Sequence, residues 1–148
     1  MATVGGNCSL RSVGADPQPP VPLERTLDGV LGFEFLETGE EEAHARFTVG
    51  DQHRQPMGIV HGGAYAALAE SLCSRSTHLA VSPHSIAVGQ SNLTTFMRPV
   101  SEGPIDAVAR RKHRGRTTWV WEVDFTDEQG RLCAATRVTM AVRPVSSP

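Results

Sequence analysis

The residues best suited to chemistry lie close together near the middle of the chain. Residues 58–74 read Gly-Ile-Val-His-Gly-Gly-Ala-Tyr-Ala-Ala-Leu-Ala-Glu-Ser-Leu-Cys-Ser. The first amides of a helix have no partner within it and lie at the positive end of the helix dipole. Because Gly62 and Gly63 carry no side chain, a ligand oxygen can approach these amides. The segment could therefore hold an anion or a developing oxyanion.

A carboxylate and a hydroxyl follow in the same segment. Glu70 lies about two turns further along, and Ser74 lies one turn beyond it on the same helix face, where it could orient the carboxylate. Because its neighbours are apolar, we expect Glu70 to lose solvation and its pKa to be raised. Such a carboxylate can act as a nucleophile or as a general base. The same residues could instead have structural roles. His61 could cap the helix or lie in the core, Gly62 and Gly63 could form a tight turn or a close helix–sheet contact, and Glu70 could lie on a narrow solvent-facing stripe.

A long helix must position these groups. Residues 62–79 contain no proline, are rich in alanine and are apolar nearly all round, which predicts a buried helix that ends by Pro83. Elsewhere, apolar residues alternate with polar ones, as in half-buried strands. We expect a short helical turn over residues 23–27, a break at Asp28 and Gly29, and strands over residues 30–35, 43–49, 85–97, 105–109, 119–125 and 132–142. One long helix with several antiparallel strands is an α+β pattern, in which the sheet can wrap around the helix.

Composition limits the classes of protein that fit. The chain has 148 residues, 39% of them hydrophobic, and a formal net charge of -2. We expect a Gly-, Ser- and Pro-rich disordered tail over residues 1–21 and one domain over residues 22–148. No global charge favours nucleic acid or an acidic membrane, and no apolar run spans a bilayer. The three cysteines and six histidines fit neither a disulfide framework nor a metal site, so we expect a cytoplasmic protein without metal.

The chain resembles hotdog-fold acyl-CoA thioesterases, most closely the 4-hydroxybenzoyl-CoA thioesterases with a helix glutamate and the PaaI-like group. The resemblance rests on His-Gly-Gly followed by Ala-Leu-Ala-Glu and covers nearly all of residues 22–144. Further matching segments occur in the same order: Thr26-Leu-Asp-Gly, Ala87-Val-Gly-Gln-Ser-Asn, Phe96-Met-Arg-Pro-Val, Thr117-Thr-Trp, Gly130-Arg-Leu-Cys-Ala and Ala141-Val-Arg-Pro. It implies a hotdog fold and a homotetramer built as a dimer of dimers.

The resemblance also implies roles for particular residues. The Gly62 amide polarises the thioester carbonyl, Gln55 assists it, and Glu70 takes part directly as nucleophile or general base. Ser74 stands where the branch often has threonine, and His61 supports the loop or the substrate. Asp28 would lie near the acyl group, where it could accept a hydrogen bond from a ring hydroxyl; turn formation explains it equally well.

Coenzyme A carries phosphates, which basic residues could bind. Arg98, Arg116 and Thr117 fall at or beside positions that contact the nucleotide in the branch, although Arg116 replaces a smaller hydroxyl residue. The run Arg-Arg-Lys-His-Arg-Gly-Arg over residues 110–116 could also hold phosphate, or could be a strand end with solvated charges. The chain lacks the basic C-terminal tail of the branch, which leaves part of this phosphate site without a counterpart.

We therefore expect an acyl-CoA thioesterase of aromatic degradation that acts on a hydroxybenzoyl-like thioester, with no cofactor besides the CoA of its substrate. A hotdog hydratase or dehydratase and a non-catalytic acyl-CoA binding protein are the alternatives. The residues do not specify the acyl group, because pocket shape depends on how the helix, Tyr65 and an opposing subunit meet.

Overall fold

A computed structural model describes residues 21–145 of the chain. The disordered tail expected over residues 1–21 thus lies outside the described residues, apart from Val21. The elements are, in chain order, η1 (Leu23–Arg25), α1 (Leu27–Val30), β1 (Glu34–Thr38), β2 (Glu42–Thr48), η2 (Asp51–His53), α2 (Gly62–Val81), β3 (Ser85–Phe96), β4 (Pro104–Arg114), β5 (Thr118–Thr126) and β6 (Leu132–Pro144).

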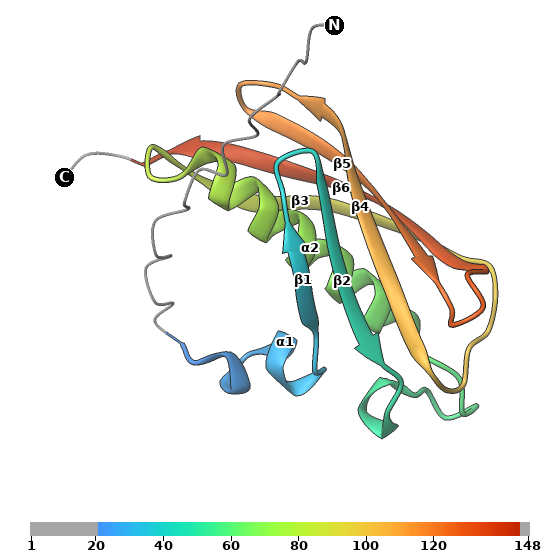
Figure 1. The fold of residues 1–148 in the computed structure, drawn as a ribbon. Helices are drawn as coiled ribbons and strands as arrows, with labels where there is room; N and C mark the ends of the chain where they lie inside the picture. The colour runs from blue at the N-terminus through green and yellow to red at the C-terminus, as the bar shows by residue number, and fades with distance from the viewer. Residues whose placement is uncertain (1–20, 146–148) are drawn as a thin grey trace, which may run out of the picture.

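The six strands form one antiparallel sheet in the order β1-β2-β4-β5-β6-β3. The sheet curves around α2, which lies in its concavity (Figure 1). Strand residues alternate between buried and more exposed positions, most regularly in β2, β4 and β5. This alternation confirms the strands predicted from the period of two, and the arrangement is the hotdog fold.

The core lies between α2 and the concave face of the sheet. Leu68 and Leu72 of α2 are fully buried there, with Phe47, Trp121 and Phe125 from the strands. The helix begins at Gly62 and continues to Val81, two residues beyond its predicted end, and Ser82 caps it before Pro83. Burial is confined to one side: the side that carries Glu70 and Arg75 remains open to solvent in the single chain.

The start of the domain differs from the prediction. Asp28 and Gly29 do not break the chain into a strand but belong to α1, because the Thr26 hydroxyl accepts a hydrogen bond from the Gly29 N–H at 3.3 Å. The first strand consequently begins at Glu34, and Phe33 packs into the core just before it. A hydroxyl cap thus extends helical structure where the Asp-Gly pair favoured a turn.

Strand β3 is one free edge of the sheet and carries apolar side chains on its surface. Ile86, Val88 and Leu93 are exposed, Leu93 to 72%. Such an edge presents unpaired backbone groups that can join another strand. Within residues 21–145, no helix is long and apolar enough to cross a membrane.

Candidate active site

The N-terminus of α2 leaves one backbone amide free. The His61 side chain caps the helix through Nδ1, which accepts a hydrogen bond from the Gly63 N–H at 2.8 Å. The His61 carbonyl accepts the Ala64 N–H at 3.0 Å. No acceptor in the described part of the chain bonds the Gly62 N–H. Gly62 therefore offers a donor at the positive end of a helix, as predicted.

The first turn of α2 packs closely against the end of β3. A Cβ built on Gly62 would lie 2.5 Å from Cζ of Phe96, the last residue of β3. Phe96 thus packs directly against the first turn of α2. Glycine at residue 62 leaves room for the Phe96 ring and leaves the amide open to a ligand.

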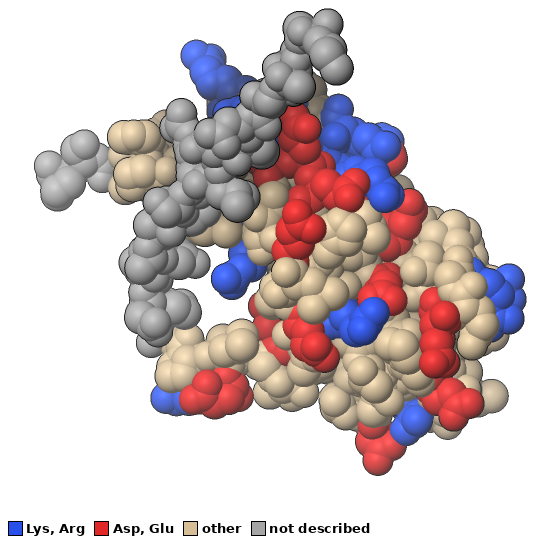
Figure 2. All heavy atoms as spheres, in the orientation of Figure 1, with Lys and Arg blue, Asp and Glu red and all other residues tan. Residues whose placement is uncertain are grey.

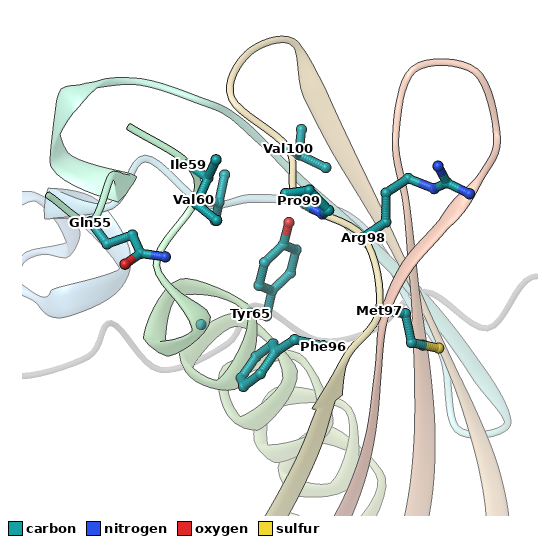
Figure 3. A pocket seen from close by; sticks show the side chains of 10 residues that line it. Gln55, Ile59, Val60, Tyr65, Phe96, Met97, Arg98, Pro99 and Val100 are labelled. Atoms are coloured by element: carbon teal, nitrogen blue, oxygen red, sulfur yellow. The ribbon is translucent and has the colours of Figure 1, made fainter. Parts of the chain in front are cut away.

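A cavity of about 310 Å³ lies beside this amide (Figure 3). Gly62 and Gln55 line it together with Tyr65, so the structure places these three residues around one space. Figure 3 shows Arg98 at the same cavity, with its guanidinium directed away from Tyr65. The remaining lining residues are apolar: Ile59, Val60, Phe96, Met97, Pro99 and Val100.

The loop that carries Gln55 is held by a buried histidine that the sequence did not single out. His53 is 1% exposed and stacks on Phe47 with ring centroids 4.7 Å apart. Its Nδ1 accepts the Gly50 N–H at 2.9 Å, so Nε2 carries the proton that is donated to the Leu31 carbonyl at 2.6 Å. These bonds join the Gln55 loop to the end of α1. The signal in the sequence was only a histidine within a polar loop.

Glu70 does not lie in the environment expected for it. It is exposed in the single chain, so the predicted desolvation among apolar neighbours is wrong for one protomer. Its carboxylate lies against the backbone of β3: a Cβ built on Gly89 would lie 2.7 Å from Oε1. The β3–β6 register shifts between Gly89 and Ser91, which places a bulge beside the carboxylate.

The hydroxyl predicted to orient Glu70 does not contact it. Among the hydrogen bonds of the described residues, none joins Ser74 to Glu70, so the expected orienting contact is absent from the protomer. Ser71 instead donates to Oδ1 of Asp28 at 2.6 Å. This bond fastens α1 to α2. It places Asp28 beside Ser71, the residue that follows Glu70 in α2. Asn92 of β3 also reaches the helix, donating to the Ala66 carbonyl at 2.9 Å.

The candidate phosphate-binding residues lie at opposite ends of the sheet. Phe96, two residues before Arg98, pairs with Ala134 of β6, whereas Thr118, which directly follows Arg116 and Thr117, pairs with Ala141. One chain therefore does not bring these three residues together.

The basic run is largely paired with acidic residues. Arg110 bonds Glu42 at 3.0 Å, Lys112 bonds Glu122 at 3.2 Å, and Arg111 bonds Glu40 at 3.1 Å. Arg114 also pairs with Glu40, and Arg111 stacks on Trp119. Basic and acidic side chains are interspersed on the face shown in Figure 2. The structure thus favours solvated, paired charges over a phosphate site in this run. Within residues 21–145, no three His, Cys, Asp or Glu side chains are placed to hold a metal ion.

Comparison with known proteins agrees with this geometry. Residues 57–134 match the thioesterase superfamily. The chain is 38% identical over 117 residues to the proofreading thioesterase EntH of Cronobacter turicensis, covering 79% of this chain and 85% of that protein. The chain therefore belongs to the thioesterase superfamily and is a thioester hydrolase. This assignment disfavours both the hydratase and the non-catalytic alternatives.

Solved structures give the same fold. A mutant of thioesterase PA1618 from Pseudomonas aeruginosa superposes with a TM-score of 0.80 at 34% identity, covering 83% of this chain and 89% of that chain. SAV0944 from Staphylococcus aureus has been solved with a glutamate replaced by alanine, at a TM-score of 0.78 and 26% identity, over 81% of this chain and 100% of that one. It has also been solved with a glutamine replaced by alanine, at a TM-score of 0.77 and 25% identity, over 80% and 98% of the two chains.

Proposed function

We propose that the protein hydrolyses an aromatic, hydroxybenzoyl-like acyl-CoA to the free acid and CoA, in the manner of the 4-hydroxybenzoyl-CoA and PaaI-like branch. The observation that carries this proposal is the free Gly62 amide, which lines one cavity with Gln55. A backbone N–H at a helix start and a side-chain amide are the donors that a thioester carbonyl needs as its oxygen gains charge.

The catalytic groups of one chain lie too far apart to act on one carbonyl. Gly62 and Glu70 are eight residues apart in a continuous helix, which is about 12 Å along its axis. A nucleophile or base must approach its target to about 3–3.5 Å. We therefore propose that Gly62 acts with Glu70 of a second copy of the chain.

The free edge of β3 is the surface on which such a dimer would form. It carries the exposed apolar residues Ile86, Val88 and Leu93, and Glu70 lies directly beside it at Gly89. A second copy packed here would desolvate Glu70, which the single chain leaves exposed. Two such dimers would give the proposed tetramer.

Two-fold pairing of these edges would also unite the phosphate-binding candidates. In an antiparallel pair, the Phe96 end of one β3 lies toward the Ser85 end of the other. Ser85 pairs with Pro144 of β6, at the end of the sheet that holds Arg116 and Thr117. Arg98 of one copy would then approach Arg116 and Thr117 of the other. This would let arginines from both copies contact the phosphates of one CoA.

The solved relatives support the roles of two residues. In SAV0944, the glutamine and the glutamate that were replaced by alanine are fifteen residues apart. Gln55 and Glu70 have the same separation here. In this chain Gln55 lies in the loop before α2 and Glu70 lies on α2. The equal separation fits a shared arrangement of the two side chains in both proteins.

The proposed reaction can follow either of two routes, and the atoms and charges balance in both. Glu70 can attack the thioester carbon, so that the C–S bond breaks and CoA leaves as its thiolate; water then hydrolyses the resulting mixed anhydride, and the proton it releases goes to the thiolate. Alternatively, Glu70 takes a proton from water, which attacks the same carbon and expels CoA. In both routes Gly62 and Gln55 donate to the carbonyl oxygen, and no cofactor is consumed.

Asp28 provides support for a hydroxyaryl acyl group. Its Oδ1 accepts the Ser71 hydroxyl, while no described residue donates to Oδ2. Because Ser71 adjoins Glu70, an acyl group attacked by that carboxylate would lie close to Asp28. The free oxygen could accept a hydrogen bond from a ring hydroxyl.

Hydrolysis of a small panel of thioesters tests the proposal. Benzoyl-, 4-hydroxybenzoyl-, phenylacetyl- and octanoyl-CoA are compared, with the parent, Glu70→Gln and Asp28→Asn. We expect aryl-CoA hydrolysis, loss of turnover in folded Glu70→Gln, and a loss in Asp28→Asn that is larger for 4-hydroxybenzoyl-CoA than for benzoyl-CoA. Unchanged activity of Glu70→Gln, or preference for octanoyl-CoA, would refute the assignment of that residue or of the substrate class respectively.

A further inference from the structure

We propose that the Tyr65 hydroxyl binds an amide carbonyl in the pantetheine arm of CoA and thereby makes the enzyme selective for pantetheine thioesters. This proposal rests on the proposed function and deepens it by assigning a residue to the thiol half of the substrate. It begins from an unpartnered polar group. Tyr65 is 3% exposed, and its buried hydroxyl has no hydrogen-bond partner among the described residues.

A buried hydroxyl without a partner is costly, since it has lost its bonds to water. The ring itself is well packed, edge-on to Phe125 with centroids 5.2 Å apart and near Phe96 at 6.2 Å. Burial raises the pKa of Tyr65 above its ordinary value, and the neighbouring Cys133 and Asp127 add to the rise. Tyr65 therefore keeps its proton and is available as a donor.

The protein groups closest to the hydroxyl do not satisfy it. Figure 3 shows the hydroxyl directed toward the segment of Pro99 and Val100. No hydrogen bond joins the hydroxyl to either residue, and the Val100 carbonyl already accepts the Val60 N–H at 2.8 Å. The Cys133 thiol donates to the Phe125 carbonyl at 3.2 Å, and its sulfur is only a weak acceptor. An occupant of the cavity could therefore supply the acceptor that the hydroxyl lacks among the described residues.

The position of Tyr65 indicates which half of the substrate that occupant is. Tyr65 lies three residues after Gly62 on the same side of α2, and both line the same cavity. The acyl group would extend from the Gly62 amide toward Glu70 and Asp28 of the second copy. The cavity of the first copy, with Arg98 at its margin, then remains for the thiol half of the thioester. In CoA that half is the pantetheine arm, whose two amides supply carbonyl acceptors along an otherwise flexible apolar chain.

Three thioesters of one acyl group distinguish this proposal from its rivals. They are 4-hydroxybenzoyl-CoA, the 4-hydroxybenzoyl thioester of N-acetylcysteamine, which keeps one amide, and the S-ethyl thioester, which has none. For the CoA thioester we expect kcat/KM of Tyr65→Phe to fall about fivefold to tenfold, as for the loss of one neutral hydrogen bond. The ratio of parent to variant should be close to one for the S-ethyl thioester. The ratio for N-acetylcysteamine shows whether the nearer or the farther amide is bound.

Each other outcome overturns the proposal. An equal loss on all three thioesters would mean that Tyr65 acts on the thioester carbonyl or on the fold. No loss on any would mean that water alone occupies the cavity near the hydroxyl. A loss on 4-hydroxybenzoyl-CoA that disappears with benzoyl-CoA would mean that Tyr65 contacts the acyl group. In all three cases the parent would still hydrolyse the CoA thioester and depend on Glu70, so the proposed function would stand.

Stability provides a second, independent measurement. Because the hydroxyl has no partner in the free protein, Tyr65→Phe should unfold at the same temperature as the parent or at a higher one. A lower unfolding temperature would show that the hydroxyl has a partner within the protein and would overturn the proposal. Ser76→Ala, which removes another buried hydroxyl without a partner but does not change a residue lining the cavity, is the matched control. It should show no preference among the three thioesters.

Discussion

The carboxylate of Glu70 lies directly over the α-carbon of Gly89 on strand β3. A side chain at residue 89 would meet Oε1 at 2.7 Å and the carboxyl carbon at 3.1 Å. Glycine at this position therefore leaves the space that the carboxylate occupies. The proposed catalytic group on α2 thus lies against a residue of β3 that is nineteen positions away in the sequence.

Gly89→Ala should consequently displace the carboxylate while leaving the fold intact. The atoms that must move are the far end of a flexible side chain, so the free energy of unfolding should change little. A displacement of about 1 Å can lower turnover about a hundredfold, and we expect a loss in kcat of roughly tenfold to a hundredfold. Measured in a Glu70→Gln background, the same substitution should cause no additional loss. An additional loss there would show that residue 89 acts independently of Glu70.

Two substitutions at Gly62 separate its amide from its small size. Gly62→Ala and Gly62→Pro both add a Cβ beside Phe96, but only proline removes the N–H. Residue 62 is the first of the helix, where proline is tolerated, and His61 has φ −67° and ψ 133°, which suit a residue before proline. We expect kcat of Gly62→Pro to lie about 10²-fold to 10³-fold below that of Gly62→Ala. Equal kcat values for the two variants would exclude the amide as an oxyanion donor.

Mixed oligomers can show whether the site is shared between copies. Gly62→Pro and Glu70→Gln homo-oligomers should both be nearly inactive. In a mixed dimer, one site combines the intact Gly62 of one chain with the intact Glu70 of the other. Co-expression with two different tags and purification on both should therefore recover activity, up to about half of the parent value per dimer. Mixed oligomers as inactive as their parents would contradict a site shared in this way.

His53 should be important for stability as well as for the position of the Gln55 loop. Replacement by phenylalanine keeps an aromatic ring against Phe47 but leaves the Gly50 N–H and the Leu31 carbonyl without their partner. Two part-buried polar groups left unsatisfied predict a loss of roughly 2–4 kcal/mol in the free energy of unfolding.

Denaturant unfolding of His53→Phe measures this loss. The matched control is His44→Phe on β2, whose partner Glu42 is exposed, and that change should stay within about 0.5 kcal/mol. Similar values for the two variants would show that the bonds of His53 contribute no more than those of a surface pair.

Much of the fold could be predicted from local patterns. The period of two in residues 43–49 and 119–125 predicted strands, and the uninterrupted run after Gly62 predicted the long helix, because these patterns depend on which side chains one face buries. The region around Asp28 was predicted wrongly. There the turn preference of Asp-Gly competes with a cap from Thr26, and only the three-dimensional contacts with α2 decide between them.

The sequence by itself determined the helix start with its two glycines, the glutamate two turns further on, and the strand set that wraps the helix. These follow from residue type and spacing along one element. The tertiary structure decided what lies opposite them: Phe96 against Gly62, Gly89 against Glu70, and the cavity in which Tyr65 has no partner. It also showed that Glu70 is exposed in one chain and that Arg98 lies at the opposite end of the sheet from Arg116. Such facts depend on strand order and register, which place residues distant in sequence side by side and which no local pattern encodes.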